Sequence, residues 1–82
     1  MSNLSIIFNK GGNTMTLQCN STDSIKNVLN KYCVKAQIDI NDYTFYYNGA
    51  EIPPICDKTL FALNIMNLQS INVVNSKKVV GA

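Results

Sequence analysis

The chain has 82 residues, 46% of them hydrophobic and 15% charged, with a net charge of +2 in which every cation is a lysine. This length fits one small domain, and the composition is too apolar for intrinsic disorder. The lysines are scattered, which favours a solvated surface over a nucleic-acid binding patch. The chain lacks the long apolar run of a membrane span, and we see no signal peptide at the start.

The first two predicted elements form a β-hairpin. Residues 4–8 and 14–19 alternate between apolar and polar side chains, as strands do. Between them, Gly11 and Gly12 supply the positive φ that a tight turn needs. The side chains expected to point inward are Leu4, Ile6 and Phe8 on the first strand and Met15, Leu17 and Cys19 on the second; Ile7 breaks the alternation and leaves the register of the first strand open.

One amphipathic helix is predicted next. Four apolar residues fall at i, i+3, i+4 and i+7, the spacing of a single buried stripe: Ile25, Val28, Leu29 and Tyr32. Among the cap-forming residues that precede them, we expect Thr22 to be the N-cap, with Asp23 in the first turn opposing the helix dipole. We expect the helix to end near Lys35–Ala36, with Lys35 in its last turn.

The second half of the chain predicts two more strands. Residues 43–47 are rich in aromatics and end at the turn pair Asn48–Gly49. Ile52 precedes two prolines, so only a brief edge or loop segment fits there. The last strand is expected at residues 70–74, with Ile71 and Val73 facing inward.

A short helical turn is expected at residues 59–63, capped by Asp57 or Thr59. The order of elements is therefore hairpin, helix, strand, helical turn and strand, which predicts a two-layer α+β domain. The core residues expected between sheet and helix are Leu17, Val28, Leu29, Phe45, Leu60, Ile65, Ile71 and Val73.

The three cysteines, Cys19, Cys33 and Cys56, are widely spaced, and the chain contains no histidine. An odd count without histidine favours neither a disulfide framework nor a zinc site. We therefore expect free thiols, no metal and no cofactor, in a reducing intracellular compartment, the cytoplasm or the nucleus.

Three segments in this order resemble the ubiquitin family: residues 21–28 (STDSIKNV), 45–52 (FYYNGAEI) and 59–65 (TLFALNI). The resemblance covers roughly residues 4–75 and leans toward the SUMO branch around residues 31–39. It implies a ubiquitin-like β-grasp fold, α+β, with a mixed sheet of four to five strands packed on one main helix. It also implies no catalytic machinery, so we do not expect an enzyme. The domain is then residues 1–75, followed by a flexible tail at 76–82.

The same resemblance implies two partner-binding surfaces. One is the outward face of the sheet, at Tyr46, Asn72 and Val74, with Lys10 or Gly11 at the hairpin tip. The other is the groove between the second strand and the helix, where an extended partner would add a strand. The groove positions are Leu17, Cys19, Val28, Lys31, Tyr32 and Lys35, although Leu17, Cys19 and Val28 fit a plain core equally well.

The chain ends in Val79-Val80-Gly81-Ala82. We interpret the domain as a non-covalent protein-binding module of a larger protein, with Gly81 in a linker, and as a monomer whose partners are other proteins. The alternative is a ubiquitin-like modifier, conjugated through Gly81 once Ala82 is removed. A third reading is a resemblance to the ubiquitin-like domains that ciliates place beside self-processing intein-like domains.

Overall fold

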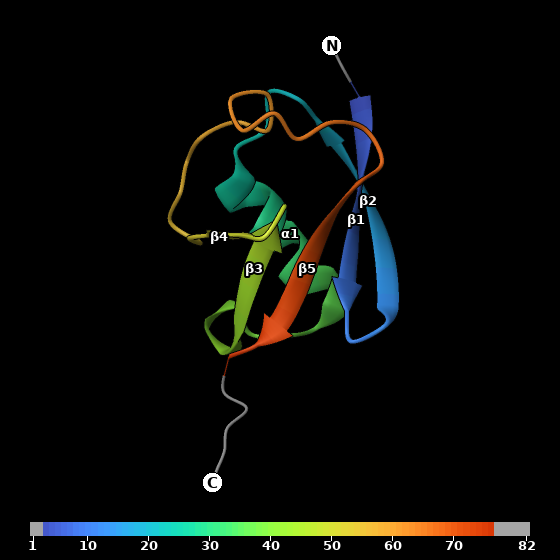
Figure 1. The fold of residues 1–82 in the computed structure, drawn as a ribbon, viewed down its shortest axis with the longest axis vertical. Coiled ribbons are helices and arrows are strands. Elements are labelled where there is room, and N and C mark those ends of the chain that lie inside the picture. The colour runs from blue at the N-terminus through green and yellow to red at the C-terminus, as the bar shows by residue number, and fades with distance from the viewer. Residues whose placement is uncertain (1–2, 77–82) are drawn as a thin grey trace, which may run out of the picture.

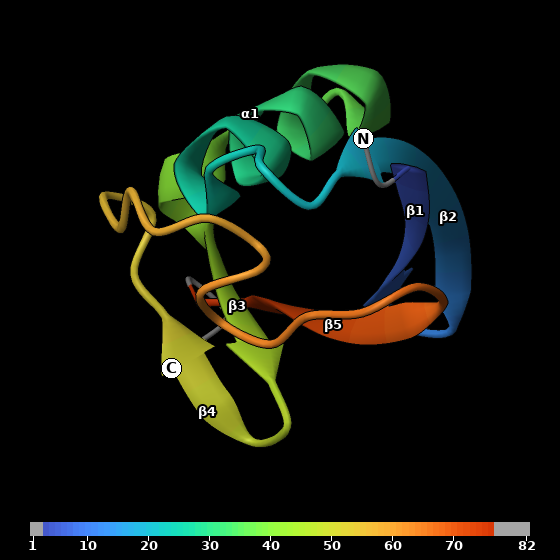
Figure 2. The ribbon, with the colours of Figure 1, turned by 90° about the horizontal axis from the view of Figure 1, so that it is seen from above.

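The structure is a computed structural model and describes residues 3–76. Its elements are β1 (Asn3–Lys10), β2 (Asn13–Asn20), α1 (Ile25–Ala36), the 3₁₀ turn η1 (Ile40–Asp42), β3 (Tyr43–Tyr47), β4 (Ala50–Ile52) and β5 (Gln69–Asn75). The strands form one sheet in the order β2-β1-β5-β3-β4, in which β1 and β5 are parallel and the other pairs antiparallel. The helix lies across one face of this sheet (Figures 1 and 2).

Two tight turns join the antiparallel strands, and both have the positive φ values that the sequence predicts. In the β1–β2 turn, φ is 57° at Gly11 and 91° at Gly12; in the β3–β4 turn, φ is 53° at Asn48 and 80° at Gly49. Two successive residues of positive φ make a turn whose twist matches that of the flanking strands. The predicted hairpin is confirmed, and its first strand has Leu4, Ile6 and Phe8 buried, which decides the register that Ile7 left open.

The helix begins two residues later than the sequence analysis predicted, because Ser24 and not Thr22 is the N-cap. The Ser24 Oγ accepts a hydrogen bond of 3.2 Å from the backbone N of Asn27. Asp23 lies outside the first turn, where its carboxylate accepts from the backbone N of Asn20 at 2.9 Å. The carboxylate therefore closes the turn after β2 instead of meeting the helix dipole.

The end of the helix agrees with the prediction. It finishes at Ala36 with Lys35 in its last turn. Gln37 follows in the left-handed conformation, and its N–H donates to the carbonyls of Cys33 and Val34. A left-handed residue at this position donates hydrogen bonds to carbonyl groups that would otherwise have no donor at the end of the helix.

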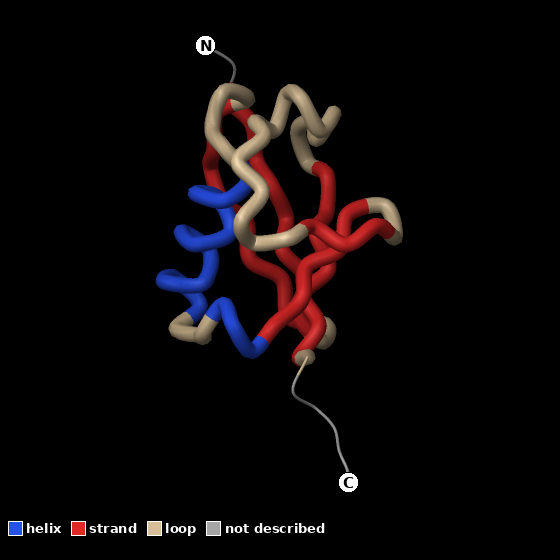
Figure 3. Tube along the Cα trace, turned by 90° about the vertical axis from the view of Figure 1, so that its left-hand side faces the viewer, coloured by secondary structure: helices blue, strands red, loops and turns tan. Residues whose placement is uncertain are grey.

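Residues 53–68 form a long connection that packs against the start of α1 (Figure 3). Thr59 caps one helical turn in it, since the N–H of Leu63 donates to the Thr59 carbonyl at 3.1 Å and that of Ala62 to Thr59 Oγ1 at 3.0 Å. The turn is held to the helix entry by Leu60, whose N–H donates to the carbonyl of Asp23 at 3.0 Å. Of the two predicted cap candidates, Asp57 and Thr59, the structure uses Thr59.

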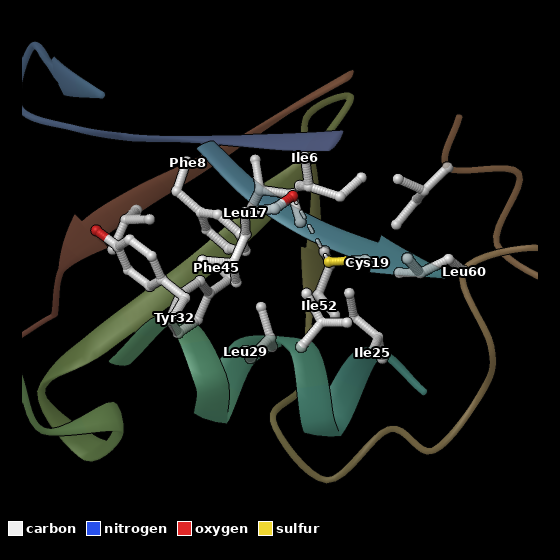
Figure 4. Close-up of a cluster of buried hydrophobic side chains, with 14 of the residues drawn as sticks. Ile6, Phe8, Leu17, Cys19, Ile25, Leu29, Tyr32, Phe45, Ile52 and Leu60 are labelled. Atoms are coloured by element: carbon white, nitrogen blue, oxygen red, sulfur yellow. Dashed lines mark hydrogen bonds between the residues drawn. The ribbon is translucent and has the colours of Figure 1, made fainter. Parts of the chain in front are cut away.

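The core lies between the sheet and the helix (Figure 4). All eight predicted core residues are buried, none of them more than 4% exposed. Three aromatic rings join the two layers: Phe8 stacks on Tyr32 with ring centroids 4.2 Å apart, and Tyr32 meets Phe45 edge-on at 6.2 Å. Aromatic pairs in these geometries add about 0.5–1.5 kcal/mol beyond the area they bury.

Candidate partner-binding surfaces

The outward face of the sheet carries one row of side chains that crosses all five strands. Strand register places Glu51 beside Tyr46, Tyr46 beside Asn72, Asn72 beside Asn9, and Asn9 beside Thr14. These side chains point away from the helix, because successive residues of a strand alternate between faces and Phe45, Ile71 and Val73 are buried. Val74, two residues after Asn72, shares this outward face.

The structure brings the three sheet-face residues of the sequence analysis together. Tyr46, Asn72 and Val74 line a shallow hollow of about 430 Å³, whose other lining residues are Asn9, Gly11, Gly12, Gly49 and Val73. Of the two hairpin-tip candidates, Gly11 belongs to this hollow. Lys10 lines a neighbouring one, and its Nζ lies 5.8 Å from the centre of the Tyr43 ring. We call Tyr46, Asn72 and Val74 the sheet surface.

Three of the residues that line the hollow are glycines at the two hairpin turns, Gly11, Gly12 and Gly49. A Cβ placed on Gly11, Gly12 or Gly49 would meet no atom within 4 Å, so these glycines serve their backbone conformation and not close packing. These three positions consequently contribute no side chain to the hollow. None of the eight lining residues is charged, and within residues 3–76 the side chain of Asn72 makes no hydrogen bond. The sheet surface is therefore open, neutral and centred on one aromatic ring.

The predicted groove is organised differently. Four of its six residues belong to the core and expose at most 5% of their surface: Leu17, Cys19, Val28 and Tyr32. Lys31 and Lys35 are exposed. The Lys31 ammonium reaches from α1 across to β2 and donates to the carbonyl of Gln18 at 3.1 Å. The four buried side chains lie beneath Lys31, between α1 and β2. Lys31 covers part of the outer edge of β2.

Burial also decides the chemistry of the core thiols and of the core phenol. It raises the pKa of Cys19, an effect that the nearby Lys31 partly opposes and Asp23 reinforces. Burial likewise raises the pKa values of Cys33 and Tyr32. Thiols and phenols of raised pKa stay protonated at neutral pH, which makes them inert packing groups.

A second apolar surface was missed by the sequence analysis. Phe61 and Met66 are 76% and 63% exposed, and they border a hollow of about 320 Å³ whose apolar lining includes Leu4 and Ile65. The sequence does carry a signal: Leu60-Phe61 and Ile65-Met66 are adjacent apolar pairs. In each pair the first residue is buried, which leaves the second at the surface.

Gly81 lies outside the described residues. Within residues 3–76, no three residues among the cysteines, aspartates and glutamates come together in a way that could hold a metal ion. The same residues contain no helix of the length and apolarity that crossing a membrane requires.

Two antiparallel hairpins, β1–β2 and β3–β4, with β5 between them parallel to β1, and one helix across one face together define the ubiquitin-like β-grasp fold. The ubiquitin-like domain of an Arabidopsis thaliana protein, solved by NMR, matches with a TM-score of 0.83 and 17% identity over 100% of this chain and 85% of that one. A designed protein based on ubiquitin matches with a TM-score of 0.78 and 21% identity over 99% and 98%.

The predicted fold and the resemblance to ubiquitin-like domains are thus confirmed at the level of structure. No family model matches the sequence. No curated protein matches it either. The SUMO-like character and the intein-like neighbour stay predictions.

Proposed function

We propose that this domain is a non-covalent protein-binding module whose working surface is the sheet surface. The observation that supports it is the grouping of Tyr46, Asn72 and Val74 around one open hollow that three turn glycines also line. Tyrosine offers a large contact area at little cost in side-chain entropy, and it is enriched among the residues that dominate binding energies. Bare glycine turns on both sides let a partner's backbone approach the ring.

The chemistry of the hollow favours a neutral partner segment. The residues that line the hollow carry no charge of their own, although Glu51 lies beside Tyr46 on the next strand, and an apolar side chain would cover Tyr46 and Val74. The Asn72 amide can donate to and accept from the partner's backbone. The groove is the weaker candidate, because its apolar side chains are already buried in the core.

The experiment places a photoreactive residue at position 72 and, as a matched control, at position 30 on the exposed side of α1. In lysate of the cells that express the protein, crosslinks should form from position 72, fall at least about tenfold with Tyr46→Ala, and be absent from position 30. A melting temperature unchanged by Tyr46→Ala shows that the fold is kept. Equal crosslinking from the two positions, or from position 72 with and without Tyr46, would refute the proposal.

The modifier alternative is tested separately with a form that ends at Gly81, incubated with ATP and the same lysate. Adducts that persist as isopeptides and disappear with Gly81→Ala would establish conjugation and displace the binding-module proposal. Adducts formed equally by both versions, or by neither, would leave the binding module as the better account.

A further inference from the structure

The turn between β3 and β4 contains the chain's one Asn–Gly pair, Asn48–Gly49. Both residues are exposed, and the turn projects away from the helix (Figure 2). Within residues 3–76, neither the Asn48 side chain nor the Gly49 N–H makes a hydrogen bond. A Cβ added at Gly49 would meet no atom within 4 Å, so no other part of the described domain packs over this glycine.

This pair is chemically labile. The backbone nitrogen that follows an asparagine can attack the carbon of the side-chain amide, and glycine has no side chain to hinder the attack. In Asn48–Gly49 both reacting groups are exposed and free of hydrogen bonds within residues 3–76.

At four other asparagines the corresponding nitrogen is held by a hydrogen bond. The N–H that follows each of them donates to a backbone carbonyl, at distances from 2.7 to 3.0 Å. The four donors are Asp42, Ile65, Leu68 and Ser76, which follow Asn41, Asn64, Asn67 and Asn75. Such a nitrogen has to lose its hydrogen bond before it can attack, which protects the asparagine beside it.

We propose that Asn48 is a spontaneous modification site, at which the domain deamidates through a succinimide formed with Gly49. The Gly49 nitrogen gives its proton to the solvent and bonds to Cγ of Asn48, while the bond from Cγ to Nδ2 breaks and Nδ2 leaves as ammonia. Water then opens the five-membered ring at one of its two carbonyls. Breaking the new bond from nitrogen to Cγ leaves aspartate at position 48. Breaking the original peptide bond leaves isoaspartate, whose main chain runs through the side chain.

The edge strand β4 controls how often the turn reaches the reacting geometry. Asn48 and Gly49 both have positive φ, 53° and 80°. In a left-handed residue the next nitrogen lies nearly opposite Cβ across the Cα–C bond, so the backbone has to rotate before the ring can close. β4 has only three residues, two of them exposed. Edges with so few buried contacts open locally at little cost, and this opening sets the rate.

Both products alter the surface around the turn. Each places a carboxylate next to Gly49, which lines the hollow of the sheet surface. Isoaspartate also lengthens the main chain by one atom, and a two-residue turn that pairs Tyr47 with Ala50 does not keep its register with the extra atom. The chemistry depends on the turn alone and holds whether or not the sheet surface binds a partner.

The test follows the mass of one peptide. The folded chain is incubated at neutral and at alkaline pH, then denatured and digested with trypsin, which cuts after lysine and releases residues 36–58. Asn41 and Asn48 are the only asparagines in this peptide. The peptide should gain one dalton, fragmentation should place the gain at position 48, and the gain should be faster at alkaline pH, because the attacking nitrogen has to lose its proton.

Asn48→Gln is the matched control. Its ring would have six members and forms far more slowly, and Gln37, with a φ of 59°, shows that glutamine adopts the left-handed conformation in this domain. A synthetic peptide of residues 45–52 gives the rate without the fold, and the folded chain should react more slowly than this peptide. No conversion at position 48 over several lifetimes of the peptide's amide, or an equal gain in Asn48→Gln, overturns the proposal. A folded chain that reacts as fast as the peptide would refute control by local opening.

Discussion

Leu29 has no exposed surface and lies on the side of α1 that meets the sheet (Figure 4). Leu29→Ala removes three carbons from this core, and such changes cost about 2–5 kcal/mol. Because small domains have roughly 5–15 kcal/mol of stability, the variant should be marginal or unfolded. Val34→Ala is the matched control on the same helix, since Val34 is 77% exposed and its loss should cost less than about 0.5 kcal/mol. Chemical denaturation measures both, and equal stabilities would mean that the helix face is wrong.

The three thiols are unpaired within residues 3–76 and differ in exposure. Cys19 and Cys33 are buried, and Cys56 is half-buried. A thiol-labelling reagent should therefore modify one group quickly and two groups only at the rate of local or global opening. A thiol titration of the denatured, unreduced protein should find three free thiols. A count of one would show a disulfide and overturn the expectation of a reducing compartment.

Burial of Cys19 and Cys33 also predicts how stability depends on pH. Their pKa values are raised in the folded state from an ordinary 9.0, so the unfolded chain loses these protons first as the pH rises. Stability is consequently complete below pH 9 and falls as the pH increases through the folded-state pKa values. Unfolding curves recorded from pH 7 upward should show this decline. Cys19→Ala should lessen its slope, and an unchanged slope would assign the decline to other groups.

At the scale of elements, the entry to α1 shows where sequence patterns lose precision. Residues 21–24 are all capable of capping a helix, and local preference alone favoured Thr22. The choice is made by Asp23, which bonds to Asn20 and so belongs to the turn before the helix. That contact depends on where β2 ends, and the spacing of apolar residues in the helix carries no information about the end of the strand. The apolar stripe itself was correctly predicted because its spacing is a property of the helix alone.

Ser24→Ala should cost about 0.5–2 kcal/mol, the usual loss when an N-cap oxygen is removed. Thr22→Ala is the control, since Thr22 caps no backbone group of α1 in the structure. Thermal unfolding of the two variants compares them directly. A larger loss for Thr22→Ala would restore the sequence prediction and contradict the observed cap.

The groove shows a similar limit. Leu17 and Val28 fit either a core or a groove on sequence alone, and the distance between helix and sheet decides between them. In the structure both are 2% exposed, so they are core residues. The sheet-surface residues were easier to predict because strand alternation fixes which face each one occupies. The gathering of Tyr46 with the glycine turns, by contrast, depends on long-range register between β3, β5 and β1.

For the whole molecule, fold class and element order followed from patterns that are local in sequence, namely alternation, helical spacing and turn residues. Strand order did not, because the pairing of β1 with β5 joins segments about 60 residues apart. The resemblance to the ubiquitin family implied a mixed sheet of four to five strands but gave no strand order. The partner cannot be deduced in the same way, since a neutral, open hollow constrains the chemistry of its occupant but not its identity.

The parallel pairing of β1 with β5 has a mechanical consequence. Ile6 lies beside Gln69 and Lys10 beside Val73, so the start of β1 and the end of β5 lie at opposite ends of the molecule (Figure 1). Tension applied between these points loads the whole ladder in shear, and its hydrogen bonds must break together. Tension applied at Thr44 and Pro53, near adjacent ends of β3 and β4, would peel bonds one after another. In single-molecule extension the first geometry should rupture at the higher force, and equal forces would show that another part of the fold bears the load.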